Sequence, residues 1–415
     1  MNRLCMISMP NQDGPMGTSW IKAKWWFWCA RYKMRRKDPR AAFSYVERSQ
    51  SLFPNSALLL AYAGYCLGAQ GRYEEAVGRY DRALQIKPDY AYVHAQLGRA
   101  FQYMQRPQEA VEALSRAFRM QPALRKHHFY QVALAKALGD IGKTEEALAA
   151  YRNAARLDAK DAEAQAGIGW ALSETGHHQD AEEPLRSAIK LSPGYAYSYS
   201  CLADILQVLN RYEDSIPFAE RFVALAPDDA DGHVRLGWGL GMAGRRREAV
   251  IAYKRALEVK PDDIAALYAV GLFHYEAGDY KEAIEALEKS ISISPQTNAN
   301  ADAYSVIAMA RMMLGDLPGA IGAGEEAVKL NPEFPEAWHN LGQCYMETEQ
   351  LEKAVASLEK VFQLGPGVPD AHYLLGLAQF KLGNWDAALE QCHALERVNS
   401  RKAQELRGVL SGEQS

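Results

Sequence analysis

Two short stretches have the glycine spacing of nucleotide-binding loops. Residues 137–144 (ALGDIGKT) match a permissive phosphate-loop pattern, and residues 239–244 (GLGMAG) match a dinucleotide-binding pattern. Such loops hold phosphate only where a strand leads into a helix, because the backbone N–H groups are then free to donate. Apolar spacing of three and four indicates a helix before each stretch. We therefore expect no nucleotide cofactor and no catalytic site at either place.

The histidines and cysteines form no pattern typical of a metal centre or a nucleophile. His127 and His128 are adjacent, as are His177 and His178. Adjacent side chains on a helix diverge by about 100°, which is poor geometry for one metal ion. No cysteine or carboxylate spacing supports these pairs as zinc ligands. The sequence predicts no metal, no cofactor and no enzymatic activity.

Charge is unevenly distributed along the 415 residues. The whole chain has a net charge of −4, whereas residues 1–56 hold ten Lys or Arg and three Asp or Glu, a net of +7. The remainder is therefore −11, and the net charge of −4 argues against nucleic-acid binding by the whole surface. Six cysteines are too few for a disulfide framework, and no apolar run reaches the roughly 18 residues of a membrane span. We expect a cytoplasmic protein.

Prolines mark a repeat of 34 residues. They stand at Pro54, Pro88, Pro122, Pro193, Pro227, Pro261, Pro295, Pro332 and Pro366, with three-residue insertions near 125–127 and 298–300. With proline as position 32, eleven repeats begin at residues 23, 57, 91, 128, 162, 196, 230, 264, 301, 335 and 369. Position 20 is alanine in ten of the eleven repeats and serine in the other. A fixed period of this length is typical of stacked supersecondary units.

Each repeat reads as two amphipathic helices joined at a glycine. Position 15 is glycine in seven repeats, where the chain reverses and a positive φ is needed. Position 8 is glycine in seven repeats and alanine in four, and we expect these small residues to face position 20 within a pair. Proline at position 32 ends the second helix.

The repeat has a characteristic pattern: a large residue at position 4, Leu at 7, Gly at 8, Ala at 20 and 27, an aromatic residue at 24 and Pro at 32. In this pattern the chain resembles the tetratricopeptide repeat family. Residues 335–368 hold one of the cleaner copies, through Trp338, Leu341, Gly342 and Ala354. The resemblance implies an all-α fold, a right-handed superhelical solenoid of about eleven repeats. We divide the chain into a flexible segment (1–22), a degenerate basic and aromatic first repeat or cap (23–56), the array (57–402), and a capping helix with tail (403–415).

In this family the concave face is lined by positions 2, 5, 9 and 12 of each first helix, here called the groove positions. The resemblance implies a non-enzymatic scaffold that binds a peptide or helix of a partner protein there. We expect the site in the late groove, where aromatic and apolar residues enriched at interfaces gather. The candidate contacts of the late groove are Tyr268, Leu272, Tyr275, Met309, Met312, His339, Gln343, Met346, Tyr373, Leu377 and Phe380, and those in the middle of the groove are Trp170 and Trp238. Self-association through this groove stays open.

The basic N-terminal stretch is rich in tryptophan. Its aromatic residues suit the capping of the first repeat, and they also suit an anionic membrane surface or a single nucleic-acid strand. The candidate membrane contacts are Trp20, Trp25, Trp28, Lys33, Arg35 and Arg36. The alternative function is thus a membrane-peripheral assembly factor anchored by this helix.

Overall fold

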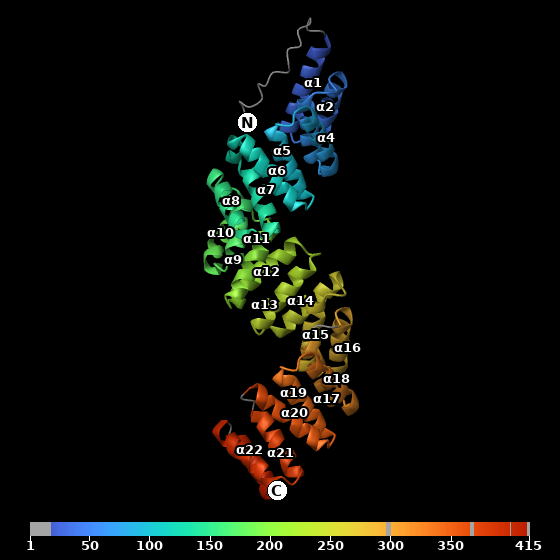
Figure 1. The fold of residues 1–415 in the computed structure, drawn as a ribbon, viewed down its shortest axis with the longest axis vertical. Helices are drawn as coiled ribbons and strands as arrows, with labels where there is room; N and C mark the ends of the chain where they lie inside the picture. Colours follow the sequence, from blue (N-terminus) through green and yellow to red (C-terminus); the bar gives the residue numbers. More distant parts are fainter. Residues whose placement is uncertain (1–17, 296–299, 366–368, 399, 413–415) are drawn as a thin grey trace. The chain divides into compact units, whose positions relative to one another are not determined.

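The computed structural model describes residues 18–295, 300–365, 369–398 and 400–412, and these form α-helices joined by short turns, with one 3-10 helix and no strand. The chain divides into two compact units, Met1–Leu209 and Asn210–Ser415. Each is a row of helix pairs (Figure 1). The prediction of an all-α helical repeat fold is confirmed.

The first unit holds five helix pairs and one further helix. These are α1 (Thr18–Arg35), α2 (Pro39–Leu52), α3 (Ala57–Gly68), α4 (Tyr73–Ile86), α5 (Ala91–Tyr103), α6 (Pro107–Met120), the 3-10 helix η1 (Pro122–Lys126), α7 (His128–Asp140), α8 (Thr144–Leu157), α9 (Ala162–Glu174), α10 (His178–Leu191) and α11 (Ala196–Val208). Helix η1 contains part of the first predicted insertion, and its Leu124 is buried.

The second unit holds α12, five pairs and a closing helix. These are α12 (Tyr212–Leu225), α13 (Ala230–Met242), α14 (Arg246–Val259), α15 (Ile264–Ala277), α16 (Tyr280–Ile293), α17 (Asn300–Met313), α18 (Leu317–Leu330), α19 (Pro335–Glu347), α20 (Leu351–Leu364), α21 (Pro369–Lys381), α22 (Trp385–Val398) and α23 (Ser400–Ser411). Most of the second insertion lies outside the described residues.

The helix ends of the two units follow from single residues. Ser56, Asp161 and Asp263 precede α3, α9 and α15, and each side chain accepts a hydrogen bond from a backbone N–H in the first turn. All eleven residues at position 15 have a positive φ, between 56° and 86°. Seven are the predicted glycines, and the other four are Lys37, Gln105, Asn210 and Glu349. The turn therefore imposes this conformation on whatever residue the sequence supplies.

A repeated three-residue contact holds each pair together. Every position-20 residue is fully buried. A Cβ atom added to Gly98, at position 8, would lie 2.5 Å from Cγ of Leu114 at position 24 and 3.0 Å from the backbone oxygen of Ala110 at position 20. The small residue at position 8 thus admits the large side chain at position 24 as well as the backbone at position 20, which refines the predicted 8–20 contact.

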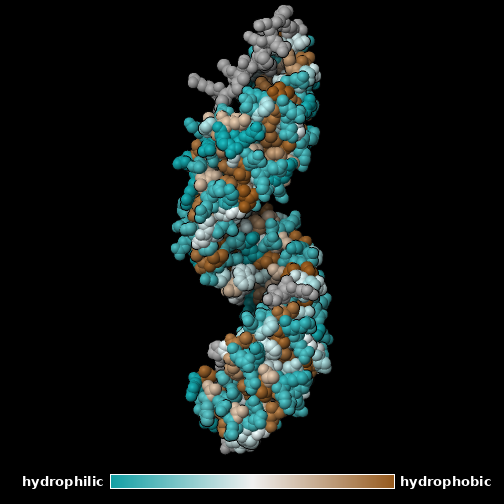
Figure 2. Space-filling model, viewed as in Figure 1, coloured by the Kyte–Doolittle hydropathy of each residue, from teal (hydrophilic) through white to brown (hydrophobic). Residues whose placement is uncertain are grey.

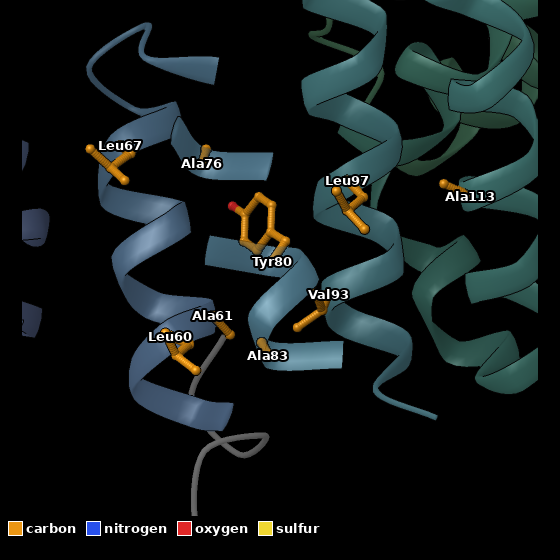
Figure 3. Packing of buried hydrophobic residues seen from close by; sticks show 9 residues of the cluster. All are labelled: Leu60, Ala61, Leu67, Ala76, Tyr80, Ala83, Val93, Leu97 and Ala113. Carbon is orange, nitrogen blue, oxygen red and sulfur yellow. The ribbon is translucent and has the colours of Figure 1, made fainter. Parts of the chain in front are cut away.

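The core runs between neighbouring pairs as a chain of apolar clusters. In one of them the Tyr80 ring lies between the helix that carries Leu60 and Leu67 and the helix that carries Val93 and Leu97 (Figure 3). The surface in view is mainly hydrophilic, with hydrophobic residues in small groups (Figure 2). Each pair therefore buries its apolar side against the next, as in a solenoid.

The two ends of the array differ from the predicted boundaries. Helix α1 begins at Thr18, within the segment 1–22 that we expected to be flexible, and residues 1–17 lie outside the described residues. Helix α23 begins at Ser400, and its buried Leu406 packs with Leu395 and Cys392 of α22. We keep the division into cap, array and closing helix as a proposal.

Candidate functional site

The first helices of successive pairs pack side by side within the first unit. Helix α5 contacts α7, α7 contacts α9, and α9 contacts α11. Their groove positions consequently fall along one line of neighbouring helices. Five residues from these positions, Gln102, Lys136, Glu163, Trp170 and Tyr197, line a common cavity.

This cavity, here called the α5–α11 cavity, has a volume of about 340 Å³. Its walls come from five helices and one turn of the first unit. The lining residues are Gln102, Lys136, Asp140, Tyr151, Glu163, Gly167, Trp170, Tyr195 and Tyr197. A volume of a few hundred cubic ångströms suits one or two side chains of a bound segment.

Two glycines make room for the aromatic wall of the cavity. A Cβ atom on Gly139 would lie 2.6 Å from Cη2 of Trp170, so the indole rests on the bare backbone of α7. A Cβ atom on Gly167 would lie 2.3 Å from Cε1 of Tyr151. Gly167 stands at position 6 of its repeat, and no other repeat has glycine at that position. The ring positions therefore depend on these two glycines.

The charges of the cavity are close together and of both signs. Lys136 and Glu163 form an ion pair, and Asp140 is exposed beside them. Burial raises the pKa of Tyr151, Tyr195 and Tyr197, and the Glu163 carboxylate adds to the effect on the first two. The phenols stay neutral near pH 7 and keep a proton to donate. Aromatic faces, hydroxyl donors and carboxylates suit a peptide segment, including one with a basic side chain.

The late groove in the second unit is differently built. Its side chains are mostly half-buried against each other and against the next repeat, and Met346 is only 6% exposed. The Tyr268 hydroxyl donates to the Asp302 carboxylate over 3.2 Å. Burial, with the Asp302 carboxylate as a second cause, raises the pKa of Tyr268 to about 12. The polar end of this tyrosine is therefore already bound within the protein.

Two further aromatic residues of the late groove pack on side chains across the turn of their own repeat. The Tyr275 and Tyr280 rings lie 5.8 Å apart, and the Phe380 ring meets Trp385 edge-on at 4.9 Å. In the last pair, the Lys402 ammonium lies 5.9 Å from the Tyr373 ring centre. Neighbouring residues thus occupy much of the aromatic surface that we expected to be free.

The remaining predicted contacts differ in exposure. Leu272, Met309, Met312, Gln343 and Leu377 are half-buried, whereas Trp238 is 51% exposed. His339 is half-buried, and its Nε2 atom makes no hydrogen bond among the described residues. Burial lowers the pKa of His339, so its neutral form is favoured.

Sequence comparisons identify the family. Models of the tetratricopeptide repeat match residues 64–105, 91–124, 132–196 and 234–298. Residues 313–394 match the model described as anaphase-promoting complex, cyclosome, subunit 3. The chain is a tetratricopeptide repeat protein.

Similar proteins include two curated relatives and two solved structures. DnaJ homolog subfamily C member 7 of Mus musculus is 41% identical over 64 residues, 15% of this chain and 13% of that protein. E3 ubiquitin-protein ligase CHIP of Arabidopsis thaliana is 39% identical over 59 residues, 14% of this chain and 21% of that protein. The matches therefore cover about a fifth or less of either relative's length.

The two solved structures are YrrB and the Cut9–Hcn1 complex. YrrB, described as a TPR protein with an unusual peptide-binding site, has a TM-score of 0.39 at 24% identity, over 45% of this chain and 94% of that one. The anaphase-promoting complex hetero-tetramer Cut9–Hcn1 has a TM-score of 0.49 at 13% identity, over 95% of this chain and 90% of that one.

In this tetratricopeptide protein, sequence reasoning named only part of the α5–α11 cavity. The groove positions include Gln102, Lys136, Glu163, Trp170 and Tyr197, and of these only Trp170 was a candidate contact. Asp140, Tyr151, Gly167 and Tyr195 were missed, because none of them stands at position 2, 5, 9 or 12. The glycine at position 6 was the available signal, since it appears in no other repeat.

The phosphate-loop and dinucleotide patterns lie at ordinary repeat turns. Gly142 follows α7 with a φ of 78°, and Gly244 follows α13 with a φ of 80°, with no strand before either. Within the described ranges, no group of three or more His, Cys, Asp or Glu side chains is placed to share a metal ion. In the same ranges no helix combines the length and apolar character needed to cross a bilayer.

The predicted membrane contacts lie on or just after α1. Trp25 is 60% exposed and Trp28 is 56% exposed, whereas Trp20 is half-buried. Lys33 lies 3.7 Å from Asp38, and Arg36 lies over the Tyr32 ring. Arg35 is exposed at the end of the helix.

Proposed function

We propose that this tetratricopeptide scaffold holds a segment of a partner protein at the α5–α11 cavity of its first unit. Protein interaction is the function that the family supports, and the cavity is the observation that carries the finer proposal. It combines a hollow of about 340 Å³ with aromatic walls and charged groups from neighbouring repeats. Aromatic anchors in such hollows contribute most of the binding energy at many interfaces.

The late groove remains a second proposed site for the same function. Trp238, from the middle of the groove, is exposed, whereas Tyr268, Tyr275 and Phe380 present only their uncovered faces. A partner that binds there would compete with contacts that the protein already makes. We rank this site below the cavity for that reason.

An affinity experiment distinguishes the two sites. Full-length wild-type chain, Trp170→Ser/Tyr197→Ser and Tyr268→Ser/Tyr275→Ser/Phe380→Ser would each be used to capture partners for quantitative mass spectrometry. We expect the first variant to lose the main partner and the second to retain it. Loss in the second variant alone would move the site to the late groove. Retention by both variants would overturn groove binding.

A single methyl group gives a finer test of the cavity. Gly139→Ala forces the Trp170 indole to move, because the new Cβ atom would lie 2.6 Å from it. We expect about a tenfold loss of affinity for the captured partner with little loss of helix. Gly78→Ala is the matched control, since a Cβ atom there meets nothing within 4 Å. Equal affinity of both variants and the wild type would show that the indole position does not matter.

The other finer expectations stand as proposals. We propose a non-enzymatic scaffold, as is general in this repeat family, and a location in the cytoplasm. Self-association would occupy the groove with a second copy. It would appear as concentration-dependent mass in sedimentation equilibrium, and Tyr268→Ser/Tyr275→Ser/Phe380→Ser would abolish it.

A second candidate function is that of a membrane-peripheral assembly factor. The observation in its favour is a stripe of exposed apolar and aromatic residues on α1, which forms the outer side of the first pair. Contiguous exposed apolar surface of this kind marks interaction sites in other proteins.

A further inference from the structure

Helix α1 has an inner face that belongs to the repeat array. Ala23 and Ala30 are fully buried, and the Ser49 hydroxyl of α2 donates to the Ala23 backbone oxygen over 3.1 Å. The Phe27 ring packs edge-on against Tyr62 of α3 at 5.0 Å. One side of α1 therefore packs against α2 and α3 within the array.

The opposite side of α1 exposes four large residues in a line. Ile21 is 58% exposed, Trp25 60%, Trp28 56% and Tyr32 54%. Their spacing of four, three and four residues keeps them within an arc of about 60° on a helix. This line, here called the outer stripe, points away from Ala23 and Ala30. The face that packs in the array and the exposed face are thus opposite sides of one helix.

Basic residues border the outer stripe on both sides. Helix α1 contains Lys22, Lys24, Arg31, Lys33 and Arg35 and no acidic residue. At 100° per residue, Lys24, Arg31 and Arg35 fall on one flank and Lys22 and Lys33 on the other. The Arg31 guanidinium lies 5.0 Å from the Trp28 ring centre. The apolar outer stripe and its basic flanks complement a surface whose outermost groups are negatively charged and whose next layer is apolar.

We propose that the outer stripe of α1 binds the surface of an anionic phospholipid bilayer, lying in the plane of the interface. This inference rests on the membrane-peripheral function proposed above and names its lipid and its contact residues. Trp25, Trp28 and Tyr32 enter the boundary between headgroups and acyl chains, where aromatic rings with one polar edge are stable. The lysines and arginines remain at the level of the lipid phosphates.

The charge and shape of the stripe favour a bilayer over other occupants. In a dimer of two α1 helices, ten cationic groups with no acid on either helix would be brought together. A single nucleic-acid strand is usually bound in a positively charged groove that follows its backbone. The outer stripe is instead a convex helix ridge, which fits a flat and deformable surface.

The test is co-sedimentation of the full 415-residue chain with vesicles. The vesicles would contain phosphatidylcholine alone or with about 30% phosphatidylserine, since the negative surface potential comes from the anionic lipid. We expect binding to the anionic vesicles, weakened by salt, and little binding to neutral ones. Trp25→Ser/Trp28→Ser should reduce the partition constant by about tenfold or more. Lys22→Glu/Lys24→Glu should reduce it by at least about fivefold for each residue.

The control variant changes exposed residues elsewhere in the chain. Tyr103→Ser/Ile251→Ser removes side chains that are 52% and 62% exposed, so it matches the loss of surface apolar area. It should bind anionic vesicles as the wild type does. Circular dichroism of each variant checks that the helices are intact. Equal loss in the control would overturn the assignment to α1.

Each remaining outcome is decisive. If the wild type fails to bind anionic vesicles, both this inference and the membrane-peripheral function are wrong. If both α1 variants bind as the wild type does, the membrane function survives and the outer stripe is not its contact. Concentration-dependent dimers that only Trp25→Ser/Trp28→Ser abolishes would assign the stripe to a second copy of the chain. Binding to a labelled oligothymidine that only this variant abolishes would assign it to a nucleic-acid strand.

Discussion

The α5–α11 cavity and the late groove use the same repeat positions with opposite results. In the first unit, Trp170 and Tyr197 border a hollow that also exposes charged groups. In the second unit, Tyr268 is hydrogen-bonded to Asp302, and Phe380 packs against Trp385. An aromatic residue at a groove position is thus free for a partner only where its neighbours leave it uncovered.

The difference arises from residues outside the groove positions. Gly139 and Gly167 let rings lie against backbone, which opens the cavity beside them. In the late groove, large residues at position 17, Tyr280 and Trp385, cover the aromatic side chains at position 12. The helix frame is the same in both units, so the composition of the surrounding positions decides whether a groove is open.

The largest expected difference between the late groove and the α5–α11 cavity is the loss of local stability when an aromatic residue is replaced. Phe380→Ser should cost about 2 kcal/mol, because the half-buried ring packs against the apolar cluster of α22 and α23 and against Trp385. Tyr197→Ser should cost less than about 1 kcal/mol, since Tyr197 is 41% exposed. Hydrogen exchange in urea, followed at α21 and at α11, measures both. A larger loss for Tyr197→Ser would mean that the two regions have been assigned the wrong way round.

Substitutions at position 20, which both units share, should lower the stability of the two regions by similar amounts. Ala181→Leu in α10 and Ala249→Leu in α14 replace fully buried position-20 residues, and each should cost about 1–3 kcal/mol by overpacking. Distant repeats should keep their exchange protection, because contacts in an array are between nearest neighbours. Ile251→Leu, at an exposed site of α14, serves as the control within about 0.5 kcal/mol. Unchanged protection around Ala249→Leu would disprove the packing frame.

The turn residues allow a smaller and stabilising change in each unit. Gln105 and Glu349 have φ values of 56° and 57°, which glycine adopts without steric cost. Gln105→Gly and Glu349→Gly should each stabilise by about 0.5–1 kcal/mol, whereas Gly244→Ala should destabilise by about 1 kcal/mol. Thermal unfolding compares the three variants. Destabilisation by both glycine substitutions would show that the left-handed turn carries no strain.

A fall in pH should lower the stability of the late groove, because this groove contains His339. The α5–α11 cavity should not respond in this way, since its lining includes no histidine. Since burial lowers the pKa of His339, the unfolded chain takes up a proton near pH 6.5, whereas the folded chain takes it up only at a lower pH. The contribution of neutral His339 to stability is therefore complete above pH 6.5 and is lost as the pH falls below it. The pH dependence of unfolding should be weaker in His339→Gln than in the wild type. Identical slopes would contradict the assignment.

The sequence predicted the frame better than the site. The 34-residue period, the glycines at position 15 and the alanines at position 20 fixed the helix pairs, because these positions depend on local turn geometry and contact within one repeat. The state of the groove depends on contacts between repeats. The Tyr268 hydroxyl donates to Asp302 of the next repeat, and Tyr195 lines the cavity from a turn. Residue spacing along the chain does not predict where these side chains lie.

The central claim is that a partner segment contacts the α5–α11 cavity rather than the late groove. Site-specific photo-cross-linking tests it most directly, with p-benzoyl-phenylalanine placed at Tyr197 in one full-length protein and at Tyr275 in another. Each would be irradiated with the partner recovered by affinity capture. The account predicts a cross-linked product from the position of Tyr197 and none from that of Tyr275. A product from the position of Tyr275 alone would contradict it.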